Sequence, residues 1–315
     1  MTQNLHRSAP AGLYCGQACR AAHALKRKTA MTTAPITRFA PSPTGRLHLG
    51  HAFSALVASQ LGGGYRLRID DVDHTRCRPE YTEQIYDDLA FLGLPWRGEP
   101  VFQSDRLHQY AQALDRLREM DLVYPCFLTR AELAEVLSAP HEPPTATDGV
   151  LSAREAARRS GSGTAPAWRL RTARALELTE SPTWLDLRTG YRRSLDMSVH
   201  GDVIVARRDI RTSYHLSVVV DDMIDGVTLV TRGMDLENST DVHRLLQAIL
   251  EIPAPAYYHH DLVCDEDGQR LAKRHNALSI SELRQSGLSA TEILSHLPDF
   301  TESEIISSDC SLFSN

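Results

Sequence analysis

The sequence lacks both of the glycine-rich patterns that most often mark a nucleotide site, because it contains neither a Walker A sequence nor Gly-x-Gly-x-x-Gly. Any nucleotide site is therefore of neither the P-loop nor the dinucleotide type. The chain also lacks an apolar run of the roughly 18 residues that a membrane-spanning helix needs. Residues 1–30 contain basic residues and no acid, but they lack the continuous apolar segment of a secretory signal. We expect no membrane partner.

Cysteine is sparse, with six residues scattered over 315 positions in no regular framework. This usage excludes a disulfide scaffold and predicts reduced thiols in a cytoplasmic protein. Cys15 and Cys19 lack a partner with ligand spacing, so we expect no metal there. We expect residues 1–32 to be a disordered extension, residues 33–298 to form the folded domain and residues 299–315 to be a tail.

Strand and helix signals alternate through most of the chain. We expect strands at 37–40, 65–69, 202–206 and 226–232, and helices at 52–61, 80–92, 106–120, 214–220 and 241–250. The first strand, helix and second strand form a βαβ unit, and the glycines at 62–64 end its helix. From 129 to 201 the pattern is looser, with loops around a helix near 152–159, and it predicts an insertion at about 124–201.

The stretch from Arg38 to His51, Arg-Phe-Ala-Pro-Ser-Pro-Thr-Gly-Arg-Leu-His-Leu-Gly-His, is typical of a turn between a strand and a helix. Two prolines and Gly45 fix the turn, so backbone N–H groups and the helix dipole face any anion bound there. His48 and His51 flank Gly50, which permits close backbone approach, and both imidazoles can donate to phosphoryl oxygens. The pattern predicts a phosphate site, and a helix cap with two surface histidines is the alternative.

This stretch resembles the first signature of the class I glutamyl-tRNA synthetases, Arg-Phe-Ala-Pro-Ser-Pro-Thr-Gly-x-Leu-His-x-Gly-His, at every specified position. Arg270-Leu-Ala-Lys273-Arg is similar to their second signature, Lys-Met-Ser-Lys-Ser or Lys-Leu-Ser-Lys-Arg, with Arg270 and Ala272 as departures. The resemblance covers about residues 37–288. It implies an α/β catalytic domain with a Rossmann-type parallel sheet, an inserted mixed subdomain, and a signature loop at about 265–276.

The chain ends 42 residues after Lys273 (315 − 273), where a glutamyl-tRNA synthetase has a helical anticodon-binding domain. We expect that domain to be missing, which makes the resemblance closest to the truncated glutamyl-queuosine tRNA(Asp) synthetases. Those enzymes activate glutamate with ATP in the absence of tRNA and attach it to the queuosine base in the anticodon of tRNA(Asp). The resemblance implies L-glutamate, ATP and the anticodon arm of tRNA(Asp) as partners, and we expect a monomer.

The resemblance also implies a mechanism in which the α-carboxylate of glutamate attacks the α-phosphorus of ATP and pyrophosphate leaves. Catalysis then consists of positioning and electrostatics, with His48 and His51 beside the phosphates, Lys273 neutralising the developing charge and Mg²⁺ carrying the ATP. Thr44 and Gly50 complete the expected ATP-binding set. In the second step, a hydroxyl of the queuosine cyclopentenediol attacks the activated carbonyl.

Glutamate binding needs a planar arginine fork for a carboxylate and an acid for the ammonium group. By resemblance, the expected glutamate pocket consists of Arg38, Phe39, Ala40, Pro41, Ser42, Asp70, Tyr214 and Arg232. The family usually has Arg-Ile-Glu-Asp where this chain has Arg-Ile-Asp-Asp at 68–71, and Asp70 is shorter by one methylene. We therefore expect weaker glutamate binding than in relatives with glutamate at this position.

A structural zinc site of the family is expected to be absent. Family members commonly carry Tyr-Pro-Cys-x-Cys followed by a later Tyr and Cys. Here Cys126 keeps one thiol, Leu128 replaces the next, and the expected counterpart of the later pair, around 144–148, has neither residue. Structural zinc needs about four ligands, so we predict no zinc and no other metal ligated by the protein.

The net charge of −6 argues against a surface that is basic everywhere, although an RNA partner requires phosphate neutralisation somewhere. Solvated faces explain most arginine runs, so the clusters are only candidates for RNA contact. They are Arg154, Arg158, Arg159, Arg169, Arg171, Arg174, Arg188, Arg192, Arg193, Arg207, Arg208 and Arg211.

Other functions stay open at this stage. A catalytically impaired RNA-binding remnant would explain Asp70, Ala272 and the missing zinc ligands together. A related class I nucleotidyltransferase acting on a small molecule would share the histidine motif, and a fragment-like glutamyl-tRNA synthetase would charge the 3′ end of tRNA(Glu). The sequence also leaves open whether His259 and His260 pack in the core or contact substrate.

Overall fold

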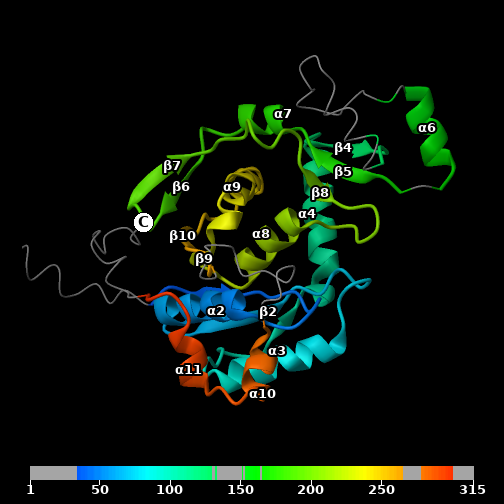
Figure 1. The fold of residues 1–315 in the computed structure, drawn as a ribbon. Coiled ribbons are helices and arrows are strands. Elements are labelled where there is room, and N and C mark those ends of the chain that lie inside the picture. Colours follow the sequence, from blue (N-terminus) through cyan, green and yellow to red (C-terminus); the bar gives the residue numbers. More distant parts are fainter. Residues whose placement is uncertain are drawn as a thin grey trace, which may run out of the picture. The chain divides into compact units, whose positions relative to one another are not determined.

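The computed structural model describes residues 34–129, 132, 151, 153–163, 165–264 and 278–300 (Figure 1). The helices and strands below all lie within the unit Pro35–Ser308. The predicted extension at 1–32, and all but two residues of the predicted tail, lie outside the described residues. Within the described ranges, no helix has the length and apolar character needed to cross a membrane.

Two parallel sheets carry the fold. Their strands are β1 (Thr37–Phe39), β2 (Tyr65–Ile69), β3 (Val101–Phe102), β6 (Thr183–Asp186), β7 (Tyr191–Ser194), β9 (Leu229–Gly233) and β10 (Ala256–His260). The first sheet has the order β1-β2-β3 and the second β7-β6-β10-β9, with β7 as an antiparallel edge. The amides of Thr228 and Leu229 donate to the Ile36 carbonyl, so the chain entering β1 adjoins β9. The order β3-β2-β1-β9-β10 is that of doubly wound folds, which confirms the predicted α/β fold.

Helices connect the parallel strands, as the alternating pattern predicts. α2 (Leu49–Gly62) links β1 to β2, α3 (Pro79–Phe91) links β2 to β3, and α9 (Ser239–Ile249) links β9 to β10. α2 ends at Gly63, whose φ of 58° is the left-handed conformation that glycine adopts without strain. α4 (Leu107–Glu119) and α8 (Tyr214–Ile224) pack against each other, and α8 also packs on α9.

Two hydrophobic clusters form the core. One includes Phe39 of β1, Phe53 of α2 and Leu89 of α3. The other includes Leu117 of α4 and Leu245 of α9. Burying each such side chain contributes about 1.5–3 kcal/mol, so the helices that border the parallel strands are firmly held.

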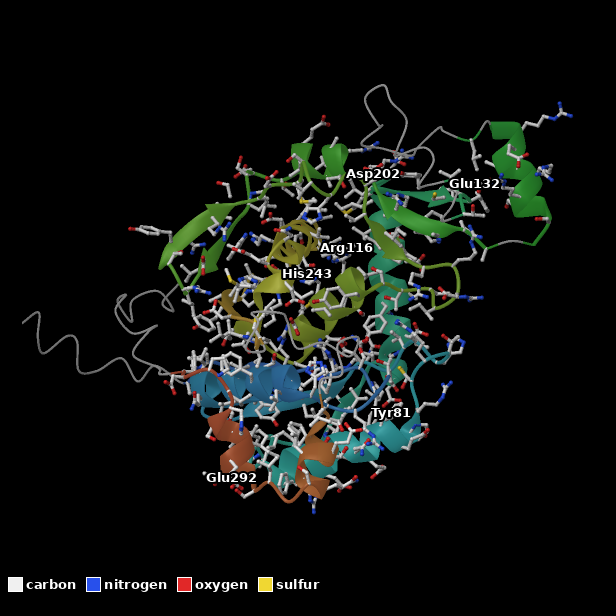
Figure 2. All side chains as sticks on the ribbon, in the orientation of Figure 1. Tyr81, Arg116, Glu132, Asp202, His243 and Glu292 are labelled. Carbon is white, nitrogen blue, oxygen red and sulfur yellow. The ribbon has the colours of Figure 1, made fainter. Side chains whose placement is uncertain are left out.

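A smaller antiparallel sheet lies largely within the predicted insertion. It consists of β4 (Val123–Cys126), β5 (Ala167–Leu170) and β8 (Ile204–Ala206), with α6 (Ala153–Gly161) and α7 (Thr172–Glu177) nearby in the chain. Asp202, labelled in Figure 2, links β4 to the start of α7. Its carboxylate accepts from the Tyr124 hydroxyl at 2.8 Å and from the Thr172 amide at 3.0 Å. β6 and β7 fall in the same predicted range but belong to the β9–β10 sheet. The domain and insertion limits stay a prediction.

After the segment 265–277, the chain returns to the first signature. The Ile280 amide donates to the Leu47 carbonyl at 2.9 Å, and Ser279 forms an isolated β-bridge with His48. α10 (Ile280–Gln285) and α11 (Ala290–Ser295) follow, and Ile280 joins the cluster that holds α2. The two short helices therefore anchor this part of the chain beside the start of α2.

Candidate functional site

A cavity of about 330 Å³ lies at the carboxyl ends of β1, β2, β9 and β10. Because β2 lies on one side of β1 and β9 on the other, this is the place where doubly wound folds bind ligands. The cavity is lined by twelve of the thirteen predicted site residues, namely Arg38, Phe39, Ala40, Pro41, Ser42, Thr44, His48, Gly50, His51, Asp70, Tyr214 and Arg232. Lys273, the thirteenth, lies outside the described residues.

The two signature histidines open α2 and hold each other in place. The His48 Nδ1 accepts from the Gly50 amide at 3.1 Å, and the His51 Nδ1 accepts from the His48 amide at 3.2 Å. The ring centroids are 3.9 Å apart. Since each Nδ1 is an acceptor, the ring proton is assigned to Nε2 on both residues. The pair therefore presents Nε2–H donors, in addition to backbone amides at a helix N-terminus.

Gly50 is needed because the His48 ring lies over it. A Cβ at position 50 would meet the His48 ring atoms at 3.1 and 3.2 Å, tighter than most side-chain contacts. Any larger residue would push the ring out of its capping position, which explains a glycine between the two histidines.

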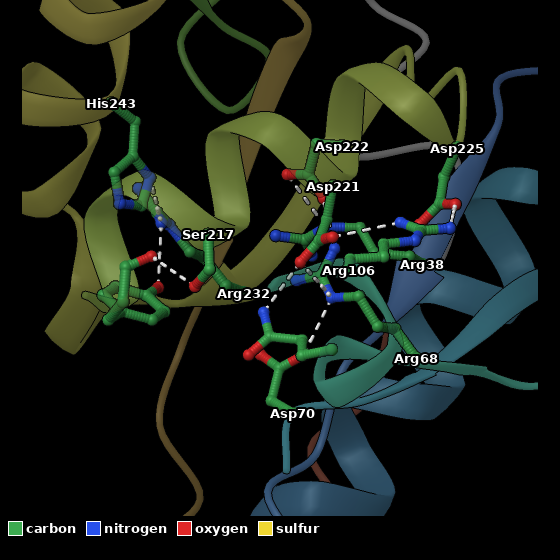
Figure 3. Close-up of polar contacts among 12 residues, drawn as sticks. Arg38, Arg68, Asp70, Arg106, Ser217, Asp221, Asp222, Asp225, Arg232 and His243 are labelled. Carbon is green, nitrogen blue, oxygen red and sulfur yellow. Dashed lines mark hydrogen bonds and ion pairs between the residues drawn. The ribbon is translucent and has the colours of Figure 1, made fainter. Parts of the chain in front are cut away.

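A buried charge network joins the two sides of the cavity floor (Figure 3). Asp222 of α8 accepts from Arg38 Nε at 3.1 Å and from Arg68 Nη1 at 2.7 Å. Burial alone would raise the pKa of Asp222, but the two guanidinium groups outweigh it and the pKa lies below its usual value. The Arg38 Nη1 also donates to the Thr231 carbonyl at 3.0 Å. The arginine that we expect to bind substrate is thus fixed by β1, α8 and β9.

Asp221 continues the network on the side of α4. Its carboxylate pairs with Arg106 at 3.0 Å and accepts from the Tyr110 hydroxyl at 2.8 Å and Gln103 Nε2 at 2.7 Å. It also lies 3.5 Å from Arg68 Nε. These donors offset the cost of burying the Asp221 carboxylate, so Asp221 can hold Arg68 in position.

Asp70 stands at the end of β2, where its carboxylate accepts from Arg68 Nε at 2.8 Å. Its amide donates to the Pro41 carbonyl at 3.0 Å, which fastens the end of β2 to the first signature. Burial raises the pKa of Asp70 to about 6, although Arg68 opposes the shift. Its protonation state therefore changes just below neutral pH.

Arg232 of β9 is surrounded by neutral acceptors. Its Nη1 lies 3.1 Å from His243 Nδ1 and donates to the Tyr214 hydroxyl at 3.3 Å, while Nη2 donates to Thr240 Oγ1 at 2.6 Å. His243 lies in the interior (Figure 2). Burial and then the Arg232 charge lower the pKa of His243 well below its usual value. The ring therefore stays neutral and can accept from the guanidinium.

The adjacent histidines 259 and 260 have different surroundings. His259 is buried, accepts from Arg232 Nε at 3.4 Å and packs edge-on against Trp184. His260 lines the cavity, and its Nε2 lies 3.0 Å from Ser54 Oγ. The sequence left open whether these two histidines pack in the core or face a ligand. In the structure His259 packs in the core beside Arg232, and His260 lines the cavity.

Several cavity residues were not among the predicted ones. They are Ser54, Arg68, Val218, Thr231, Gly233, Asp235, Leu236, His260, Leu262 and Val263. Strand alternation could have found Arg68, because it precedes Asp70 by two residues and so shares its face. His260 had no such signal, because the residues of β10 are all buried and show no polar alternation.

Residues 36–301 match the family model described as tRNA synthetases class I (E and Q), catalytic domain. The chain belongs to this family. The Glutamyl-Q tRNA(Asp) synthetase of Rhodobacter capsulatus is 44% identical over 82% of this chain and 98% of that protein. The Glutamyl-Q tRNA(Asp) synthetase of Nitratidesulfovibrio vulgaris is 39% identical over 84% of this chain and 87% of that protein.

The class I fold also appears in a solved structure. A glutamate tRNA ligase from Elizabethkingia meningosepticum in complex with its amino acid superposes with a TM-score of 0.62 at 25% identity. The match covers 81% of this chain and 53% of that one, so the chain spans about half of that synthetase. The predicted class I synthetase fold is confirmed.

The described residues on both sides of the segment 265–277, which contains the predicted second signature, lie at or next to the cavity. Leu262 and Val263, just before the segment 265–277, line it. Ser279, just after that segment, pairs with His48. The predicted second signature is therefore bounded on one side by residues that line the cavity and on the other by a residue that pairs with His48.

Proposed function

We propose that this chain activates glutamate with ATP to glutamyl-adenylate in the absence of tRNA, and transfers the glutamate to the queuosine base in the anticodon of tRNA(Asp). The observation that carries the proposal is the single cavity in which the histidine pair, two fixed arginines and Asp70 face one another. Similarity to two Glutamyl-Q tRNA(Asp) synthetases over most of their length supports the same reaction. We further propose a cytoplasmic monomer.

The glutamate subsite is proposed to lie between Arg38, Asp70 and Arg232. Guanidinium forks bind carboxylates, and the Asp70 carboxylate suits the ammonium group. Asp222 and the neutral histidines keep both arginines in place before substrate arrives. Because both arginine side chains are already ordered, glutamate binding costs little side-chain entropy, which favours affinity.

ATP is proposed to bind at the start of α2, with Thr44 and Gly50 near its phosphates and both signature histidines donating to them. A carboxylate oxygen of glutamate attacks the α-phosphorus, the bond to the bridging oxygen breaks, and pyrophosphate leaves. The Nε2–H groups of His48 and His51 stabilise the negative charge that develops on the phosphoryl oxygens. We expect Mg²⁺ to arrive bound to ATP and assign it no protein ligand.

Lys273 is proposed to complete the site from the second signature. It precedes Ser279 by six residues, so its Cα can lie at most about 22 Å from that of Ser279. Since Ser279 pairs with His48, a lysine at this position is within chain reach of the phosphates. Its charge would neutralise the leaving pyrophosphate.

One experiment tests the proposal against its alternatives. The protein is incubated with radiolabelled glutamate, ATP and total tRNA from cells with and without queuosine, and the labelled tRNA is cut to locate the label. We expect label in the anticodon arm, and only with queuosine-containing tRNA, together with tRNA-independent pyrophosphate exchange. Label at the 3′ end would favour a glutamyl-tRNA synthetase, and absence of exchange would favour a catalytically impaired remnant.

A further inference from the structure

The hairpin of β6 and β7 reaches the same edge of the sheet as the cavity. β6 runs parallel to β10, with Asp186 opposite Tyr257. The turn that follows β6 therefore emerges at the carboxyl ends of the parallel strands, where the cavity lies. Figure 1 shows the hairpin at the margin of this sheet, with β6 between β7 and β10.

Two arginines tie the hairpin to the residues around the cavity. Arg188, in the turn, pairs with Asp261 at 2.7 Å, and Asp261 lies between the cavity residues His260 and Leu262. Arg193, on β7, pairs with Glu237, which follows the cavity residue Leu236. The hairpin is thus attached to the cavity rim at two points.

The hairpin presents an aromatic ring to solvent. Tyr191 is 74% exposed, which is the highest value among the large hydrophobic residues that the structure describes. All four residues of β7 are exposed, and in the described part of the chain β7 pairs with β6 alone. A single exposed tyrosine is ordinary, but this one stands next to Arg192 in a hairpin that is attached to the cavity rim.

Arg192, next to Tyr191, forms no ion pair with another described residue, whereas several of the other candidate RNA-binding arginines do. Arg159 pairs with Glu132 and Glu155, Arg174 with Asp121, and Arg207 with Asp73 and Asp209. Their charge is compensated within the protein. Arg192 therefore keeps a positive charge that can meet a phosphate.

We propose that the RNA substrate rests on the exposed edge of β7, where Tyr191 is a platform that stacks on an unpaired base beside the base that enters the cavity. Arg192, on the other face of this edge strand, meets the RNA backbone. Proteins read single-stranded loops by stacking unpaired bases on aromatic rings, with arginine at the backbone. The two arginines of the edge strand β7 also disfavour pairing with another strand, which argues for nucleic acid over protein. The inference rests on the proposed transfer to an anticodon and adds a recognition surface to it.

The test compares Tyr191→Ala with Tyr191→Phe and Tyr191→Trp. Two quantities are measured, namely binding of a fluorescent tRNA(Asp) anticodon stem-loop by anisotropy and the transfer of glutamate to queuosine-containing tRNA(Asp). We expect Tyr191→Ala to weaken both by about tenfold, because stacking on one base is lost, while the aromatic variants stay near wild type. Pyrophosphate exchange without RNA should be unchanged in all three.

Leu178→Ala is the matched control, because Leu178 is 59% exposed but precedes the amino end of β6, away from the cavity. It should leave every readout unchanged. Arg192→Ala should weaken stem-loop binding and reduce the slope of log affinity against log salt by about one.

Wild-type binding and transfer in Tyr191→Ala would overturn the platform, as would an equal loss in Tyr191→Phe, since the phenyl ring retains stacking. A wild-type protein without pyrophosphate exchange would instead refute the proposed function. The effect of Tyr191→Ala on stem-loop binding would then still test the platform, because this binding does not require activation of glutamate.

Discussion

At the residue scale, the length of Asp70 is expected to limit glutamate binding. Both its carboxylate and its amide are held, by Arg68 and Pro41 respectively, so the short side chain cannot move toward the substrate. Asp70→Glu should lower the apparent KM for glutamate in pyrophosphate exchange by about two- to fivefold, the worth of a partly screened ion pair. The KM for ATP serves as the control and should not change. An unchanged glutamate KM would refute this explanation.

The same residue predicts a pH dependence. Burial raises the pKa of Asp70 to about 6, so the carboxylate is ionised above this pH and protonated below it. Only the ionised form attracts the ammonium group of glutamate. The glutamate KM should therefore rise as the pH falls from 7 to about 5.5, while in Asp70→Asn it should be higher and flat over this range. A wild-type KM that stays level across the same interval would exclude Asp70 from ammonium binding.

The sequence revealed the residues that we propose to bind substrate better than the residues that hold them in place. Arg38 and Arg232 could be named because a contiguous motif surrounds each. Asp222 could not be assigned to Arg38, because the two residues are 184 positions apart in the sequence and meet only in the folded chain. Buried charge partners depend on tertiary contacts, which periodicity does not report.

At the element scale, the second signature is expected to act through Lys273. Lys273→Ala should reduce glutamate-dependent pyrophosphate exchange by at least about tenfold, or roughly 1.4 kcal/mol of transition-state stabilisation. Lys273→Arg, which keeps the charge, should retain more activity than the alanine variant. The comparison is valid only if both variants unfold at the wild-type thermal midpoint. Near-normal exchange in folded Lys273→Ala would remove the lysine from the site.

Asp222 of α8 pairs with arginines on β1 and β2, so we expect its substitution to lower the free energy of unfolding. Asp222→Asn leaves Arg38 and Arg68 without their shared carboxylate, and breaking a buried ion pair costs about 3–5 kcal/mol. Urea unfolding should show this decrease in the free energy of unfolding. Asp115→Asn is the control, because the Arg118–Asp115 pair is exposed and should cost under about 1 kcal/mol. Equal losses of stability in the two variants would contradict the role of Asp222 in holding Arg38 and Arg68.

Element prediction succeeded where side-chain periodicity was clear. The helices α2, α3 and α9 and the strands β1 and β2 were expected within three residues of their observed ends. The strands β3, β4, β5, β6, β7 and β10 were missed. β10 is buried along its whole length and β7 is exposed along its whole length, so neither shows the alternation that marks a half-buried strand.

At the scale of the whole molecule, the antiparallel β4–β5–β8 sheet is held by contacts that need no metal. β4 and β5 pair over four residues, and Asp202 links Tyr124 to Thr172. Leu170 and Val205 also join the core that holds α4 and α8. Cys126 is buried, and in the described part of the chain no group of three or more histidine, cysteine or acidic residues could hold a metal ion. We therefore predict that the fold is independent of zinc.

This independence can be measured on the intact protein. Metal analysis should find well below one zinc per chain, and a chelator should leave the thermal unfolding midpoint unchanged, since a metal bound only to the folded state would raise it. Cys126→Ala should cost only about 1 kcal/mol, as expected for one buried side chain. Stoichiometric zinc with a chelator-sensitive midpoint would mean that Cys126 is a ligand. Its substitution should then lower the midpoint as far as the chelator does, which separates a metal-bound thiol from one that only packs.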